Sequence, residues 1–429
     1  MTSTAWMTSS AVSSSDPSGS VSGLGWPSSR SCAVVTRSFF FLMVVAMVAL
    51  APVAPCANAT SRVTISSTHC YAAQGEKGLL IFPLDRYSAY VAIPPPQGLS
   101  KISDMFLEPG GRFLFVLSLG GSGGGSSFAV LSLANATAPT LVGGPVAVSA
   151  GPYGAVCGKA GTIVIAGGES NLTVWKYDQA TGQVVSNTPE KSFRVGKSQD
   201  RVLLSNDGKA AYVKGELDPL LGHGVGYGVM IVPLDNPTAI SPIQVPNAPA
   251  PLQSGPGPVV FPMESALSED GKVLFTAHGE GVSSINVSNP LDCTLLTDAE
   301  TIPQEYYSIA VVGQQAFAVG YTPVPRLLEI DISDPSALVM SKLLRFTFKR
   351  PVSVAANKQF FYIADWGTDC VVVIDRATKL ATWAGCEVVA GGRRPNRPVR
   401  GHRGSTRGQT RPQASAPPSS PSAPVPPSS

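Results

Sequence analysis

The chain has 429 residues and a formal net charge of +3, and only 14% of its residues are charged, against about 25% in an average soluble protein. Its hydrophobic content of 44% excludes a wholly disordered chain. Its 43 glycines and 38 prolines exclude a long-helix or coiled-coil protein, because both residues interrupt helices. An all-β fold with many turns remains.

Residues 1–59 are expected to form a leader outside the fold. A Ser-rich stretch without periodicity is followed by Arg37 and by an apolar run at 39–51. This run is shorter than the roughly 20 residues of a membrane-spanning helix and suits the apolar region of a signal peptide. The small-x-small pattern at 57–59 (Ala-Asn-Ala) predicts cleavage before Thr60.

A cleaved signal predicts a protein without a membrane span that is secreted or held at the cell surface. Two alternatives stay open. The stretch before the apolar run is long for a signal peptide, which also fits an uncleaved anchor in a type II membrane protein. Because that stretch is Ser-rich and acid-poor, it also resembles a transit peptide, which would lead to an organelle lumen.

Residues 391–429 are expected to form a disordered tail. Seven arginines and no acid lie between Arg393 and Arg411, and a Pro/Ser-rich end follows that resembles the tails of hydroxyproline-rich cell-wall glycoproteins. The arginine stretch is suited to binding an anionic polymer, with a solvated linker as the alternative. The tail carries +7 and the leader +1, which leaves −5 for residues 60–390. No specific nucleic-acid binding is therefore expected of this central part.

One apolar element recurs seven times within residues 60–390, often followed by Asp, Asn or Ser and then Pro. Its register marks, 43–57 residues apart, are Ile81, Val130, Val174, Ile231, Ile285, Ile330 and Val373. A second element, two apolar runs around a small turn such as Asp-Gly, precedes most of them and predicts a β-hairpin. Seven units of four antiparallel strands predict a seven-bladed β-propeller, and a row of β-sandwich domains is the alternative.

Two segments carry a resemblance to known propeller families. LSNDGKAAYV at 204–213 resembles the YVTN-type repeat, and LEIDISDP at 328–335 resembles the LVIVD-type repeat. The resemblance implies a seven-bladed propeller over about 62–390. It implies no single function, because such repeats occur in lactonases, surface-layer proteins, adhesins and redox-enzyme subunits. The short first strand, Val63–Ser66, is expected to pair with residues 387–390 and close the ring.

Cysteines and glycosylation sequons bear on the compartment. The cysteines after the leader lack metal-site spacing, and in a secreted protein some should pair, either Cys370 with Cys386 in the last blade or Cys70 with Cys386 across the first and last blades. The others are Cys157 and Cys293. Glycosylation is predicted at the sequons of Asn135, Asn171 and Asn286.

The candidate ligand site is the mouth of the propeller channel, where the innermost strand of each blade begins. Counting upstream from each hairpin turn gives Asp104, Tyr153, Asp200, Arg201, Glu264, Glu305, Tyr306 and Arg350. Such a ring is suited to a cation or polar ligand, and simple solvation of the entrance is the alternative. No metal or cofactor is predicted, no catalytic residue is identified, and His278 is expected at the surface.

These observations favour a secreted or cell-surface, non-catalytic propeller that acts as a binding or scaffold protein. A protein or polysaccharide partner is expected, with association to a matrix or wall through the tail. The alternative is a lactonase-like or other hydrolase that acts at the channel mouth. An enzyme needs convergent polar groups with a metal or a perturbed carboxylate there, whereas a scaffold needs only a broad face.

Overall fold

The structure is a computed structural model, and it describes ten ranges of the chain. These are 60–118, 125–149, 155–167, 171–217, 227–236, 239–244, 264–279, 281–297, 305–320 and 324–386. Within these ranges there are 28 strands and no helix. All of them belong to the compact unit Pro52–Ser429. The expected leader and tail lie outside the described residues.

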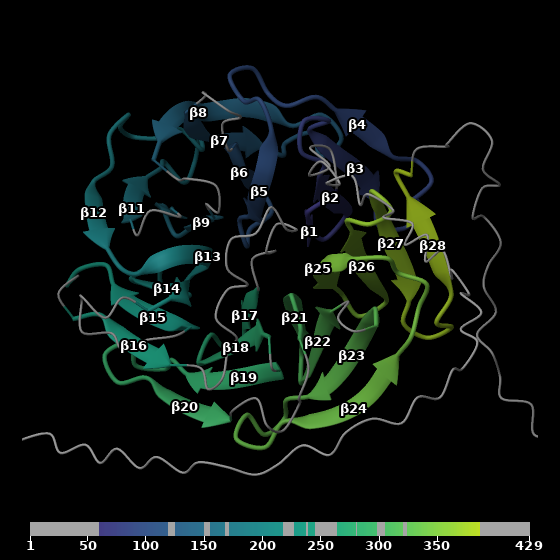
Figure 1. The fold of residues 1–429 in the computed structure, drawn as a ribbon. Coiled ribbons are helices and arrows are strands. Elements are labelled where there is room, and N and C mark those ends of the chain that lie inside the picture. Colours follow the sequence, from purple (N-terminus) through teal and green to yellow (C-terminus); the bar gives the residue numbers. More distant parts are fainter. Residues whose placement is uncertain are drawn as a thin grey trace, which may run out of the picture. The chain divides into compact units, whose positions relative to one another are not determined.

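The strands form seven four-stranded antiparallel sheets arranged in a ring, a seven-bladed β-propeller (Figure 1). Blade 1 contains β1 (Arg62–Ile65), β2 (His69–Ala73), β3 (Leu79–Pro83) and β4 (Val91–Ile93). Blade 2 contains β5 (Ile102–Leu107), β6 (Phe113–Ser118), β7 (Ser126–Ser132) and β8 (Thr140–Val148). Blade 3 contains β9 (Ala155–Lys159), β10 (Thr162–Ala166), β11 (Asn171–Lys176) and β12 (Lys191–Arg194), and blade 4 contains β13 (Lys197–Leu204), β14 (Ala210–Glu216), β15 (Tyr227–Pro233) and β16 (Ser241–Gln244). Blade 5 contains β17 (Ser265–Leu267), β18 (Val273–His278), β19 (Gly281–Asn286) and β20 (Thr294–Thr297). Blade 6 contains β21 (Ser308–Val312), β22 (Gln315–Gly320), β23 (Arg326–Asp331) and β24 (Val339–Leu344). Blade 7 contains β25 (Pro351–Ala356), β26 (Phe360–Asp365), β27 (Cys370–Asp375) and β28 (Ala381–Ala384).

The repeat in the sequence corresponds to one position in each blade. Each of the seven register marks lies in the third strand of its blade, in β3, β7, β11, β15, β19, β23 and β27. The predicted hairpins join the first strand of a blade to its second. Their turn glycines Gly111, Gly208 and Gly271 have φ of 68°, 70° and 73°, values that glycine adopts without the steric penalty of a side chain.

Apolar side chains fill the space between neighbouring blades. Seven buried clusters alternate with the seven blades around the ring, and each draws its residues from two adjacent sheets. For example, Tyr71 of β2 packs with Met105 of β5, and Phe115 of β6 packs with Ile163 of β10. Both faces of each sheet are therefore buried, which explains the low charge and the near-continuous apolar strands.

Close packing between blades 2 and 3 gives a first prediction. A Cβ on Gly158 of β9 would lie 2.3 Å from the Phe115 ring, which is itself fully buried. We expect Gly158→Ala to lower the free energy of unfolding by about 1–3 kcal/mol through overpacking. Gly125→Ala is the control, because nothing lies within 4 Å of its added Cβ. Denaturant unfolding measures both, and equal effects of the two variants would contradict the prediction.

The described residues show how the first and last blades meet. Blade 1 obtains all four strands from its own segment, because β4 supplies the outer one and β1 pairs with β2. Pairing of β1 with residues 387–390 is not needed, and those residues lie outside the described ranges. The last blade meets the first through packed side chains, such as Tyr362 against Phe82 with ring centroids 6.2 Å apart, and through a polar contact of Thr60 described below.

Candidate functional site at the propeller channel

Three of the predicted mouth residues meet in one buried cluster. The innermost strands β1, β5, β9, β13, β17, β21 and β25 surround the centre of the ring (Figure 1). Arg201 Nη1, from β13, lies 2.5 Å from Asp104 Oδ1 of β5. Arg201 Nη2 lies 3.1 Å from Oε1 of Glu264, which precedes β17. All three residues are buried, with exposed fractions of 7%, 2% and 4%.

Arg62, the first residue of β1, completes this cluster. Its Nε lies 3.5 Å from Asp104 Oδ1, and its Nη1 forms an ion pair with Glu264 Oε1. Burial opposes the charge of Arg62, but the two carboxylates outweigh burial and raise the pKa of its guanidinium. We call Arg62, Asp104, Arg201 and Glu264 the central cluster. Its two cations and two anions have no net charge.

Further hydrogen bonds connect the central cluster to the remaining blades. The backbone N–H of Val156 in β9 donates to Asp104 Oδ2 at 2.9 Å. Ser308 Oγ of β21 donates to Glu264 Oε2 and accepts from the N–H of Val354 in β25 at 2.9 Å. Polar contacts therefore run from the cluster into all seven blades. The arrangement fixes the innermost strands relative to one another and pairs each buried charge with opposite ones.

The other described candidates do not join the central cluster. Tyr306 is buried between blades 5 and 6, with Arg326 Cζ 5.9 Å from its ring centroid. Glu305 accepts a hydrogen bond from Tyr307 OH. Arg350 is half-buried, and its Cζ lies 5.2 Å from the ring centroid of Trp366. The described candidates therefore do not form the continuous ring expected from the sequence, because these three residues lie apart from the central cluster.

Two candidates cannot be placed as side chains. Tyr153 lies outside the described residues. Asp200 belongs to β13, but only its backbone is described. No group of three or more His, Cys, Asp or Glu residues suited to a metal ion occurs in the described part of the chain. None of the described segments is a helix with the length and apolarity needed to cross a membrane.

The cysteines resolve one of the open alternatives. Cys370, which begins β27, forms a disulfide with Cys386, just after β28. Cys70 and Cys157 are buried free thiols, and Cys293 is a half-buried one. Burial raises the pKa of Cys157 to about 12 and that of Cys293 to about 11. Neither thiol has the lowered pKa of a reactive nucleophile.

The predicted glycosylation sites lie at strand ends or turns. Asn135 is exposed in the turn between β7 and β8, where its Oδ1 accepts from Thr137 N at 3.2 Å. Asn171 begins β11, and Asn286 ends β19. Asn135 is therefore the most accessible of the three for a glycan, since the other two are half-buried.

His278 corrects a sequence-based expectation, because it is fully buried at the end of β18 instead of lying at the surface. Its Nε2 lies 2.9 Å from Ser283 Oγ of β19. Burial, together with the nearby Lys214 ammonium, lowers the pKa of His278 to about 3. The imidazole is therefore neutral at physiological pH and serves the packing of blade 5.

This burial predicts a pH dependence of stability. In the unfolded chain, the His278 imidazole takes up a proton below its ordinary pKa of about 6.5. In the folded chain, the same imidazole stays neutral until the pH is near 3. Stability is thus lost as pH falls below about 6.5, by about 2 kcal/mol at pH 5. Unfolding measured between about pH 7.5 and 5 should show a shallower loss for His278→Gln than for wild type. His69→Gln is the comparison: His69 is partly exposed and burial lowers its pKa as well, so this variant should change the slope less. An unchanged slope in His278→Gln would contradict the prediction.

Sequence reasoning missed Arg62 and Ser308. The candidates were found by counting back from a hairpin turn, but the β1–β2 turn contains Ser66, Ser67 and Thr68 and has no Asp-Gly to count from. Arg62 carried one other signal, since it is the first charged residue after the predicted cleavage point. Ser308 carried none, because a serine in an apolar strand is common.

Comparison with known proteins supports the fold and goes no further. The Cps50 (Swd1) β-propeller domain of Myceliophteria thermophila has a TM-score of 0.52 at 10% identity, covering 74% of this chain and 97% of that one. Hydrazine synthase of Kuenenia stuttgartiensis has a TM-score of 0.51 at 14% identity, covering 75% and 96%. A candidate 6-phosphogluconolactonase from Bacteroides uniformis has a TM-score of 0.50 at 12% identity, covering 72% and 91%.

No protein-family model matches the sequence, and no curated protein matches it. At identities of 10–14% the similar structures share the architecture alone. The chain is a seven-bladed β-propeller protein. Its function has to be argued from its own residues.

Proposed function

We propose that this protein is an extracellular, non-catalytic propeller that serves as a binding or scaffold module. In this proposal the propeller binds a protein or polysaccharide, and the arginine stretch Arg393–Arg411 attaches the protein to an anionic matrix or wall polymer. The observation that carries the proposal is the central cluster, because its charges are committed to one another at the place where a channel-mouth enzyme would need them.

The competing hydrolase would need a carboxylate or base that is free to move a proton or to hold a cation. Asp104 and Glu264 each contact both guanidiniums of the cluster. Each carboxylate also accepts a further hydrogen bond from a neighbouring blade. Both carboxylates are therefore already engaged by fixed partners within the fold. The cluster therefore suits a structural role.

Two further observations support an extracellular site of action. The disulfide Cys370–Cys386 is of a kind that persists in oxidising compartments and is rare in the cytosol. The exposed sequon at Asn135 offers a glycan an unobstructed position. Both agree with the signal peptide predicted for residues 1–59.

An activity screen tests the non-catalytic part of the proposal. The purified full-length protein is incubated with a panel of lactones and carboxylic esters, next to Asp104→Asn, Glu264→Gln and the exposed-site control Asp235→Asn. We expect no turnover above buffer for any of the four. Turnover by wild type and Asp235→Asn that either cluster variant abolishes, at a temperature where both are folded, would contradict the proposal.

The tail is tested by binding to an immobilised polyanion such as heparin or polygalacturonate. Wild type should be retained at low salt and released as salt rises, because salt screens the contacts between the arginines and the sulfate or carboxylate groups of the polymer. A variant with the seven arginines of Arg393–Arg411 changed to Gln should pass through. Equal retention of the two proteins would remove the tail from the proposal.

A further inference from the structure

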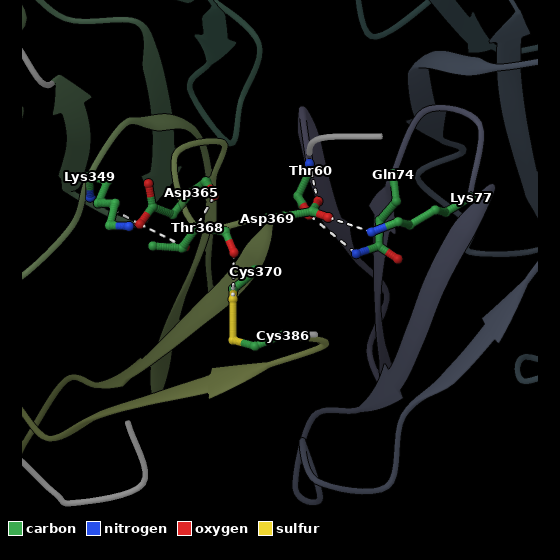
Figure 2. Close-up of a disulfide and its surroundings, with 9 residues drawn as sticks. All are labelled: Thr60, Gln74, Lys77, Lys349, Asp365, Thr368, Asp369, Cys370 and Cys386. Atoms are coloured by element: carbon green, nitrogen blue, oxygen red, sulfur yellow. Dashed lines mark hydrogen bonds and ion pairs between the residues drawn. A yellow bond between two sulfur atoms is a disulfide. The ribbon is translucent and has the colours of Figure 1, made fainter. Parts of the chain in front are cut away.

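The first described residue, Thr60, is buried at the junction between the first and last blades. Its exposed fraction is 0%. Its backbone N donates to Asp369 Oδ1 at 2.9 Å, and its Oγ1 donates to the same oxygen at 3.1 Å. Figure 2 shows the Asp369 carboxylate reaching from the last blade toward Thr60 of the first. A carboxylate is thus placed against one backbone nitrogen that is 309 residues away in sequence.

Other contacts fix this carboxylate in place. Lys77 Nζ lies 2.7 Å from Asp369 Oδ2, and Gln74 Nε2 donates to Thr60 Oγ1 at 3.3 Å (Figure 2). Asp369 lies in the turn between β26 and β27 with φ of 55°, a left-handed conformation that is uncommon for a residue with a side chain. The next residue is Cys370 of the disulfide. The turn is therefore tied to the sheet on one side and to blade 1 on the other.

The position of Thr60 coincides with a signal in the sequence. Ala57-Asn58-Ala59 has the small-x-small pattern that signal peptidases recognise, and it ends at the bond before Thr60. We propose that Thr60 is the amino terminus of the mature protein, and that its new α-ammonium group forms an ion pair with Asp369 that closes the propeller ring. This inference rests on the extracellular role proposed above.

The chemistry is a peptide-bond hydrolysis by a signal peptidase. Water adds across the Ala59–Thr60 bond and the C–N bond breaks: the carbonyl of Ala59 becomes a carboxylate, and Thr60 gains an amine that takes up the released proton. The ammonium nitrogen then takes the place of the Thr60 amide nitrogen, which lies 2.9 Å from Asp369 Oδ1 in the uncleaved chain. Hydrogen bonds between two charged groups are stronger than those from a neutral amide. Cleavage would therefore strengthen the contact between the first and last blades.

Burial of Thr60 also sets the order of events. A protease cannot reach a bond to a fully buried residue, so cleavage has to precede ring closure, as signal removal during translocation does. Among the described residues, Lys77 shares this carboxylate, with its Nζ 2.7 Å from Asp369 Oδ2. Nearby Asp365 is occupied by the backbone N–H of Lys349 and Arg350 and by Thr368 Oγ1. Asp369 is thus the carboxylate placed to receive the ammonium.

The first test is the amino terminus of the secreted protein. The full chain is expressed in a eukaryotic secretory host, and the product is analysed by amino-terminal sequencing and intact mass. We expect it to begin at Thr60. A secreted chain that begins elsewhere would overturn this inference and leave the proposed function intact. A retained chain with its leader would overturn both.

The second test separates the ion pair from cleavage itself. A glycine inserted between Ala59 and Thr60 keeps the cleavage pattern but moves the ammonium one residue upstream. We expect the midpoint of thermal unfolding to fall by about 2 °C relative to wild type. In the Asp369→Asn background the same insertion should have no effect, because the carboxylate is gone. An equal fall in both backgrounds would show that no ion pair forms.

Discussion

Replacement of Arg201 by Met is expected to lower the midpoint of thermal unfolding by roughly 6–10 °C, the largest single effect that the structure predicts. Arg201 contacts both Asp104 and Glu264 within the central cluster. Without it, two buried carboxylates share the single cation of Arg62. Removal of one partner from a buried ion pair costs about 3–5 kcal/mol, because the remaining charge is desolvated and uncompensated.

Two companion variants make this result specific. Arg345→Met removes an arginine at an exposed position and should change the midpoint little. Arg201→Met combined with Glu264→Gln restores one cation to one anion, so it should recover part of the loss. Calorimetry of the four proteins decides the matter. If Arg201→Met and Arg345→Met behaved alike, the cluster would have no structural role.

The second largest effect is expected from the disulfide in the last blade. Cys370 and Cys386 are 16 residues apart, and a loop of that length contributes about 3 kcal/mol when it is closed. Cys386→Ser should therefore lower the unfolding midpoint by roughly 6 °C. A second contribution comes from Asp369, the residue before Cys370, because its turn contacts blade 1.

Cys293→Ala is the matched control, because Cys293 is a half-buried free thiol. Its midpoint should stay close to that of wild type. Reducing agent should lower the midpoint of wild type and of Cys293→Ala, but it should have no effect on Cys386→Ser. A wild-type midpoint that is insensitive to full reduction, checked by thiol counting, would contradict the prediction.

Most of the fold could be predicted because its signals are local. A hairpin turn needs Asp-Gly or a similar pair, and Gly208 and Gly271 have the positive φ that this chemistry requires. A strand buried on both faces needs a continuous apolar run, which identified β15 and β27 as third strands. The outer strand of blade 1 carried the weakest signal, because β4 (Val91–Ile93) is short and partly exposed.

The site was predicted less completely, since it depends on which side chains meet across the ring. Counting from the turns found Asp104, Arg201 and Glu264, which lie where innermost strands begin. The same rule selected Tyr306, whose side chain packs between blades instead. Sequence spacing gives the position of a residue along its strand, but the burial and pairing of its side chain depend on residues from other blades. Arg62 was found only in the folded structure for that reason.

The central claim is that the charges described at the channel serve one another and do not form a metal site. Elemental analysis of the full-length protein tests it most directly, after incubation with Ca²⁺ and Zn²⁺ and gel filtration in metal-free buffer. We predict far less than one equivalent of either metal per chain, for wild type and for Asp104→Asn. One equivalent of Ca²⁺ or Zn²⁺ in wild type that is lost in Asp104→Asn would contradict the claim and favour a metal-dependent hydrolase.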